Sequence, residues 1–155
     1  MMFISHRGNL NGRSSEFENS PSFIENAISC GFHVEVDLWS FNNMFWLGHD
    51  NPTYLIQNEF LLKHIDALIC HAKSPETLIA LRTLNRAIHC FYHDDPSPVT
   101  LTSRGYIWSA PGQQYSSHSI LCVNDPYTYN YDLNTIIAGI FSDNIATIEQ
   151  MSNRG

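Results

Sequence analysis

Residues 32–39, FHVEVDLW, alternate apolar and acidic side chains along one short segment. The aliphatic residues would lie on one face of a β-strand and Glu35 and Asp37 on the other, because successive strand side chains point to opposite sides. The stretch therefore predicts a strand with one apolar face and two carboxylates aimed the same way. Such a strand needs a core on one side and a partner for its acids on the other.

Short apolar runs alternate with amphipathic stretches over the rest of the chain, and this order favours an α/β fold. Ser20-Pro21 and Ser74-Pro75 each combine a capping residue with a proline suited to the first helical turn, so they predict helix starts. Strands are expected at 3–5, 32–39, 45–47, 67–70, 87–92, 105–108, 119–123 and 136–141, further helices at about 54–64 and around 145–151, and loops at 94–102 and 113–118.

The whole chain, residues 1–155, is expected to form a single α/β domain. Its pattern predicts a compact, reduced TIM-like (βα) barrel. A full eightfold barrel needs about 250 residues, so some helices must be missing or replaced by loops.

The composition excludes several classes of protein. Fifteen acids against eight lysines and arginines leave a formal net charge of -7, which argues against a nucleic-acid partner. No apolar run approaches the roughly 20 residues of a membrane span, so no stable membrane insertion is expected. Four widely spaced cysteines without a C-x-x-C pair argue against a zinc ribbon or a disulfide framework, and we expect a cytoplasmic protein.

Chemistry-bearing residues gather where strands are expected to end. His6-Arg7, Glu35-x-Asp37, His49-Asp50 and His71-x-Lys73 each end or follow such a strand. In an α/β barrel the carboxyl ends of the strands meet at one rim, so these residues are predicted to form one site there.

Six segments, taken in order, resemble the glycerophosphodiester phosphodiesterase family within the phosphatidylinositol-phospholipase-C-like group. They are ISHRGN (4–9), ENSPSFIENAI (18–28), VEVDLW (34–39), LGHD (47–50), CHAKS (70–74) and GIFSDNI (139–145). The first half matches best, and residues 85–135 match only loosely.

The resemblance implies a metal-dependent phosphodiesterase acting on a glycerophosphodiester or a related lipid headgroup. His6 and His49 would be the catalytic acid and base, a role suited to imidazole at neutral pH. Arg7 and Lys73 would hold the phosphate oxygens.

The resemblance also implies one divalent cation, Mg²⁺, Ca²⁺ or Mn²⁺, held by Glu35 and Asp37. The family commonly places a third acidic ligand two residues before the lysine, where this chain has His71. His71 as the third ligand would shift the preference toward Mn²⁺. Asp94 and Asp95 are alternative acids in a nearby loop.

Two other functions remain open. The His71 departure allows a non-catalytic module that binds a phosphate ligand on the same fold. A phospholipase-D-like transphosphorylase that releases a cyclic phosphate is the second alternative. The leaving alcohol and the oligomeric state stay open.

Overall fold

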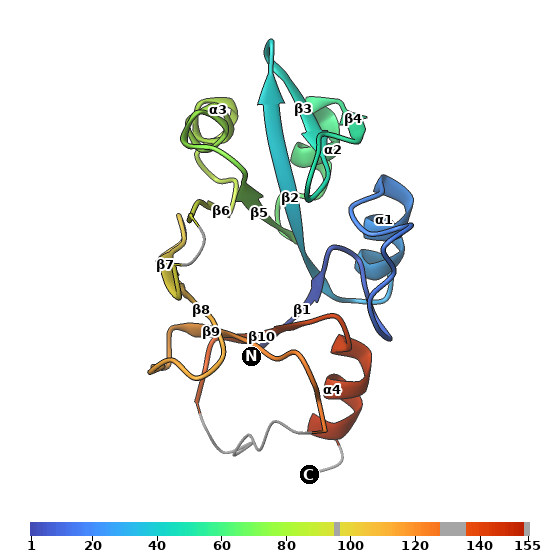
Figure 1. Cartoon of the computed structure of the whole chain (residues 1–155), viewed down its shortest axis with the longest axis vertical. Coiled ribbons are helices and arrows are strands. Elements are labelled where there is room, and N and C mark those ends of the chain that lie inside the picture. Colours follow the sequence, from blue (N-terminus) through green and yellow to red (C-terminus); the bar gives the residue numbers. More distant parts are fainter. Residues whose placement is uncertain (95–96, 128–135, 154–155) are drawn as a thin grey trace.

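The computed structural model describes residues 1–94, 97–127 and 136–153, so Asp95 lies outside the described residues. Within these ranges the chain forms ten strands and four helices, and helices alternate with strands only in part, because β6 to β10 follow one another without a helix (Figure 1). They are β1 (Met2–His6), α1 (Pro21–Ser29), β2 (His33–Phe41), β3 (Met44–Leu47), β4 (Tyr54–Ile56), α2 (Asn58–Lys63), β5 (Leu68–Ala72), α3 (Pro75–Leu84), β6 (Cys90–Phe91), β7 (Val99–Leu101), β8 (Ile107–Ser109), β9 (Ser119–Cys122), β10 (Gly139–Ser142) and α4 (Ile145–Ser152).

One mixed sheet contains all ten strands, which confirms the α/β class. Its parallel part runs in the order β6, β5, β2, β1, β10, β9, β8 and curves around a common centre (Figure 1). The long strand β2 pairs with β1 at its start, with β5 in its middle and with the antiparallel β3 at its end. β7 is antiparallel to β8.

A closed barrel is not confirmed. Within the described ranges no strand ladder joins β6 to β8, and β6 has only two residues. The turn after β7 bridges this gap instead, because Ser103 N donates to Cys90 O at 2.8 Å. Phe91 on β6 also stacks on Trp108 on β8, with ring centroids 4.7 Å apart. As expected for a reduced fold, residues 110–118 connect β8 to β9 without a helix.

Both Ser-Pro signals mark helix starts, since α1 begins at Pro21 and α3 at Pro75. Ser74 Oγ accepts a hydrogen bond from Thr77 N at 3.1 Å, as a capping residue does.

Two expectations about secondary structure were wrong. Residues 54–64 divide into strand β4 and helix α2, because Tyr54–Ile56 pair with β3. The expected loop at 94–102 contains strand β7, held by its ladder to β8.

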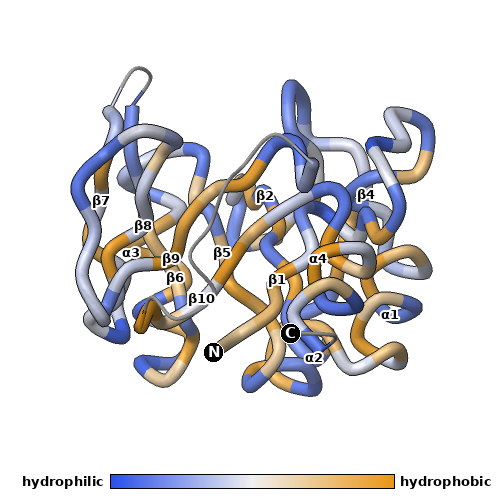
Figure 2. Tube along the Cα trace, turned by 90° about the horizontal axis from the view of Figure 1, so that it is seen from below, coloured by the Kyte–Doolittle hydropathy of each residue, from blue (hydrophilic) through white to orange (hydrophobic). Residues whose placement is uncertain are grey.

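The core divides into buried clusters on the two sides of the sheet. In Figure 2 the apolar segments, drawn in orange, include much of β5 and β9. On the outer side the apolar face of β2 packs with residues of α1, α2 and α3, and α4 packs over β10. The inner side holds a second buried cluster, Ile4, Ile69, Phe91, Trp108, Ile120 and Phe141. This apolar cluster forms the base on which the polar residues at the strand ends lie.

All four cysteines, Cys30, Cys70, Cys90 and Cys122, are free thiols. Among the described residues, none of the helices combines the length and apolar character that crossing a membrane would require.

Candidate functional site

Strand register brings the predicted site residues onto the inner face of the sheet. His6 on β1 lies opposite Glu35 on β2, and Asp37 lies opposite His71 on β5. A cavity of about 350 Å³ opens above them, a size suited to a small ligand. Six of the seven predicted site residues line this cavity: His6, Arg7, Glu35, His49, His71 and Lys73. The seventh, Asp37, is 0% exposed and lies beneath them.

Asp37 is the charged centre of the site. Its Oδ2 lies 2.8 Å from Arg7 Nε, an ion-pair contact, and accepts a hydrogen bond from Asn19 Nδ2 at 2.9 Å. Its Oδ1 lies 3.1 Å from His71 Nδ1 and 3.4 Å from Lys73 Nζ. Burial opposes ionisation, but the His71 hydrogen bond and the charges of Arg7, His71 and Lys73 hold the pKa of Asp37 well below its usual range. Asp37 is therefore an anion that all four neighbours share.

Glu35, two residues before Asp37, is a buried carboxyl whose pKa is raised rather than lowered. Its Oε2 is buried without a hydrogen-bond partner in the described part of the chain, 4.0 Å from His6 Nε2. Burial, and then the negative charge of Asp37, raise the pKa of Glu35 to about 7. An unsatisfied buried oxygen costs about 1–3 kcal/mol, so this is the group that a bound cation would satisfy.

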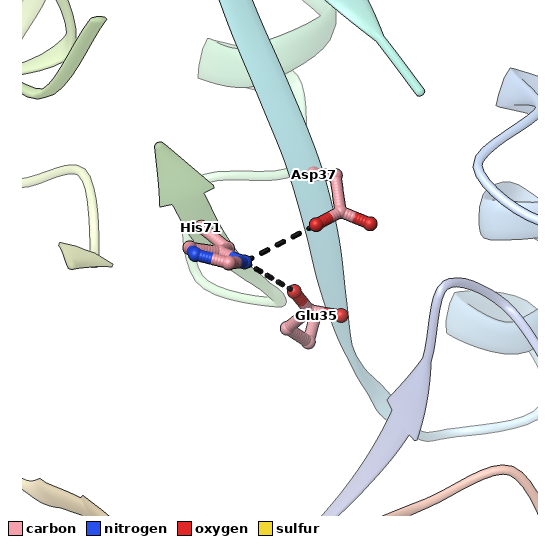
Figure 3. Close-up of side chains that lie close together, drawn as sticks. All are labelled: Glu35, Asp37 and His71. Carbon is pink, nitrogen blue, oxygen red and sulfur yellow. Dashed lines mark hydrogen bonds and ion pairs between the residues drawn. The ribbon is translucent and has the colours of Figure 1, made fainter. Parts of the chain in front are cut away.

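Glu35, Asp37 and His71 each present one ligand atom within 4.8 Å of the other two (Figure 3). His71 Nδ1 points toward both carboxylates, 3.8 Å from Glu35 Oε1 and 3.1 Å from Asp37 Oδ1. Oxygen ligands of a divalent cation lie at about 2.0–2.6 Å from it, so three atoms around one ion are separated by similar distances to those seen here. The three residues could therefore hold one metal ion.

The His71 ring is fixed by two neighbours, one on β6 and one just after it. It stacks on Phe91, with ring centroids 4.9 Å apart, and on His93, with centroids 4.6 Å apart and planes inclined by 10°. Burial lowers the pKa of His71, and the hydrogen bond to Asp37 only partly offsets this effect. A neutral imidazole is the form that binds metals, so burial and stacking both suit His71 to that role.

Arg7 and Lys73 border the cavity but are already paired. The Arg7 side chain lies between Asp37 and Glu18, with Nη1 3.3 Å from Glu18 Oε1. The Lys73 side chain is 17% exposed and contacts only Asp37 among the acids in the described residues. The ion-pair contacts with Asp37 therefore position both cations at the border of the cavity.

His6 is oriented by a residue from the far end of the chain. Its Nδ1 lies 2.8 Å from Asp143 Oδ1, just after β10, and Asn9 Nδ2 donates to the same oxygen at 2.7 Å. Burial opposes ionisation of Asp143, but the His6 hydrogen bond and charge outweigh it and lower the pKa of Asp143. An Nδ1–H donated to this carboxylate leaves Nε2 of His6 as the free nitrogen on the side of Glu35.

His49 lies on a tight turn that β2 holds in place. Gly48 has φ 147°, and a Cβ there would lie 2.0 Å from the Asn51 carbonyl oxygen, so only glycine fits. Trp39 Nε1 donates to Gly48 O at 2.6 Å, which ties the turn to β2. His49 Nδ1 lies 2.7 Å from Asp50 Oδ1, so its Nε2 is the nitrogen left for a ligand.

Three further residues belong to the site although they are not among the seven predicted site residues. Asn19 exchanges two hydrogen bonds with Asp37, although its position before Ser20-Pro21 favours a role at the start of a helix. Asp143 follows β10 within the quoted segment GIFSDNI, so the same strand-end rule that located His6 could have found it. The place of His93 after the strand expected at 87–92 suggests a residue of the pocket, and His93 does line the cavity.

The buried Glu35 carboxyl should make the stability of the metal-free protein depend on pH. Its pKa rises from 4.5 to about 7, so the folded state binds the proton more tightly than the unfolded chain between these values. The free energy of unfolding should then fall as pH rises through this window, by at most about 3 kcal/mol. Urea denaturation with a chelator, repeated across the window, measures this change.

Glu35→Gln is the matched variant, because it keeps the shape of the side chain and removes the titration. The lowered pKa of His71 acts with the opposite sign in both proteins, so the difference between them isolates Glu35. Equal pH dependence in the two proteins would contradict this prediction.

Comparison with solved structures identifies the fold. The chain superposes on a glycerophosphodiester phosphodiesterase from Parabacteroides distasonis ATCC 8503 with a TM-score of 0.61 and 9% identity, covering 99% of this chain and 97% of that one. It superposes on a glycerophosphodiester phosphodiesterase from Agrobacterium tumefaciens str. C58 with a TM-score of 0.58 and 14% identity, covering 100% of both chains. No protein-family model and no curated protein sequence matches. The chain thus has the fold of these two phosphodiesterase structures.

Proposed function

We propose that this protein is a metal-dependent phosphodiesterase that cleaves a small glycerophosphodiester or a related lipid headgroup. The observation that carries the proposal is the convergence of two carboxylate-paired histidines, two cations and an unsatisfied buried carboxylate around one cavity. The fold shared with two glycerophosphodiester phosphodiesterases supports the same reaction class.

Glu35, Asp37 and His71 are the proposed ligands of one divalent cation. Their spacing fits a single ion, and the partnerless Oε2 of Glu35 supplies an anionic group that such an ion would neutralise. When bound, the cation would stabilise negative charge on the phosphate oxygens. A donor set of two carboxylates and one imidazole favours Mn²⁺ over Ca²⁺.

His6 and His49 are proposed to exchange protons with the two oxygens that change their bonds to phosphorus. One imidazole takes the proton of the attacking hydroxyl as the new P–O bond forms, and the other protonates the leaving oxygen as the old bond breaks. Both rings point Nδ1 at a carboxylate, which leaves Nε2 of each for this exchange. Arg7 and Lys73 are proposed to hold the non-bridging oxygens.

An attacking hydroxyl on the substrate would release a cyclic phosphate, whereas water would release a monoester. Product analysis therefore separates the transphosphorylase alternative from a hydrolase. The binding-module alternative rests on His71, which stands where the family commonly has a third acidic ligand. Such a module would bind phosphate ligands without turnover.

The test is product release from a panel of glycerophosphodiesters, lysolipids and an aryl phosphodiester, assayed with Mg²⁺, Ca²⁺ and Mn²⁺ in turn. We expect turnover that a chelator abolishes and that Mn²⁺ restores best. In His71→Glu the preference should move toward Ca²⁺ or Mg²⁺, because a third carboxylate makes the ligand set harder. Turnover that survives chelation would contradict the proposed requirement for a metal ion. Binding of a diester without turnover would favour the binding module.

A further inference from the structure

One exposed face of the hairpin formed by β2 and β3 is entirely apolar. Cross-strand register pairs Trp39 with Trp46 and Phe41 with Met44, and Trp46 in turn lies opposite Leu55 on β4. Residues directly opposite each other in a sheet lie on the same face, so these five side chains form one surface. We call it the apolar platform.

The platform is open to solvent although it carries no charge. Phe41 is 49% exposed, Met44 43% and Leu55 44%, while both tryptophans are half-buried. The rings of Trp39 and Phe41 stack with centroids 6.3 Å apart and planes inclined by 15°. The opposite face of the same strands lies in the first core cluster. A contiguous exposed apolar surface of this kind marks a binding surface.

The platform is continuous with the candidate site. Glu35, Asp37, Trp39 and Phe41 alternate along β2 and so share one face of that strand. Figure 1 shows β2 leaving the curved parallel sheet and running outward with β3. The Trp39 indole donates a hydrogen bond to the Gly48 carbonyl, so the platform is tied to the turn that carries His49, a residue of the cavity lining.

We propose that the platform binds the single hydrocarbon chain of an amphiphilic phosphodiester whose phosphate lies in the cavity. This inference rests on the proposed function and narrows its substrate class. Because the platform adjoins the proposed phosphate site, its occupant should be part of the substrate molecule. Because its surface is uncharged, that part should be a hydrocarbon chain. The platform contains no lysine or arginine and the chain carries a net charge of -7, which disfavours an anionic membrane surface as the occupant.

The first test compares kcat/KM for a chain-free diester, glycerophosphocholine, with kcat/KM for lysophosphatidylcholines of increasing chain length below their micelle concentrations. The ratio of chain-bearing to chain-free values should reach on the order of tenfold or more, because each buried methylene adds to binding. It should fall in Phe41→Ser and in Met44→Ser. Leu101→Ser, an equally drastic change at an exposed residue of β7, should keep the wild-type ratio.

The second test measures binding by tryptophan fluorescence and needs no turnover. Monomeric dodecylphosphocholine should shift the emission to shorter wavelength as its chain covers Trp39 and Trp46, and glycerophosphocholine should not. The shift should weaken in Phe41→Ser and persist in Leu101→Ser. A protein that turns over no diester but shows this pattern would contradict the proposed reaction and support the platform.

Three results would overturn the platform as a chain site. One is turnover of chain-free and chain-bearing diesters with equal kcat/KM and no emission shift. Another is a shift that depends on protein concentration without amphiphile, which would indicate a second copy of the chain as the occupant. The third is a response to phosphatidylcholine vesicles but not to the monomeric amphiphile, which would indicate a membrane surface.

Discussion

Replacing His6 with alanine should lower kcat by about 10²- to 10⁴-fold, the range expected when a positioned acid or base is lost. The His6 ring is held by Asp143 on one side and faces Glu35 on the other, so alanine removes the proton carrier and leaves all three proposed cation ligands in the chain. The measurement is steady-state turnover of an aryl phosphodiester with saturating metal, together with the unfolding midpoint of each variant.

The variant Asp143→Asn tests the positioning of the His6 ring separately from the proton exchange that His6 itself is proposed to perform. It keeps the volume of the side chain but loses the carboxylate that fixes the tautomer of His6, so a smaller fall in kcat with an unchanged KM is expected. His118→Ala, at an exposed histidine outside the cavity, is the control and should retain full activity. A His6→Ala protein with the activity of the control would remove His6 from the mechanism.

Asp37→Asn should destabilise the protein strongly whereas Glu35→Gln should not, although the two acids are only two residues apart. Loss of the Asp37 charge leaves the buried Arg7 with Glu18 as its remaining anion and the partly buried Lys73 with none among the described residues. Breaking a buried ion pair in this way costs about 3–5 kcal/mol, a large part of the 5–15 kcal/mol that stabilises a typical domain. Glu35→Gln removes a buried carboxylate that has no donor on Oε2, so the free energy of unfolding at neutral pH should stay equal or rise.

Chemical denaturation of both variants without metal gives the comparison, and Asp66→Asn, at an exposed acid, is the control. In a second measurement, the rise in Tm caused by Mn²⁺ should be lost in both site variants and kept in the control, because both acids are proposed ligands. Equal destabilisation by the two substitutions would contradict the assigned electrostatics. A normal Mn²⁺ effect in Glu35→Gln would contradict the proposed ligand set.

Strand β2 illustrates how far local pattern can predict this structure. Alternation within 32–39 correctly places the aliphatic residues in the core and the two acids on the inner face, because a strand has a strict period of two. The same pattern does not reveal that β2 continues to Phe41 as a hairpin. That extension depends on its pairing with β3, a contact between segments that local hydrophobicity does not specify.

The loop expected at 94–102 is a segment whose structure the local sequence pattern did not predict. Val99–Leu101 forms a strand only because β8 offers it an edge, so its conformation depends on a partner rather than on its own residues. Asn19 and Asp143 also act through residues that are distant in the chain, Asn19 through Asp37 and Asp143 through His6. Asp143 stands at a strand end, a position that the sequence indicates, but its contact with His6 arises only in the fold.

The sequence by itself determined the α/β class, the helix starts at Pro21 and Pro75, and the residue types available for chemistry at the strand ends. These features depend on backbone propensity and side-chain period, which act over a few residues. Only the tertiary structure decided that Asp37 is a shared, fully ionised anion while Glu35 has a raised pKa. Burial and charge neighbours set those states, and both arise only when strands distant in the chain pack side by side.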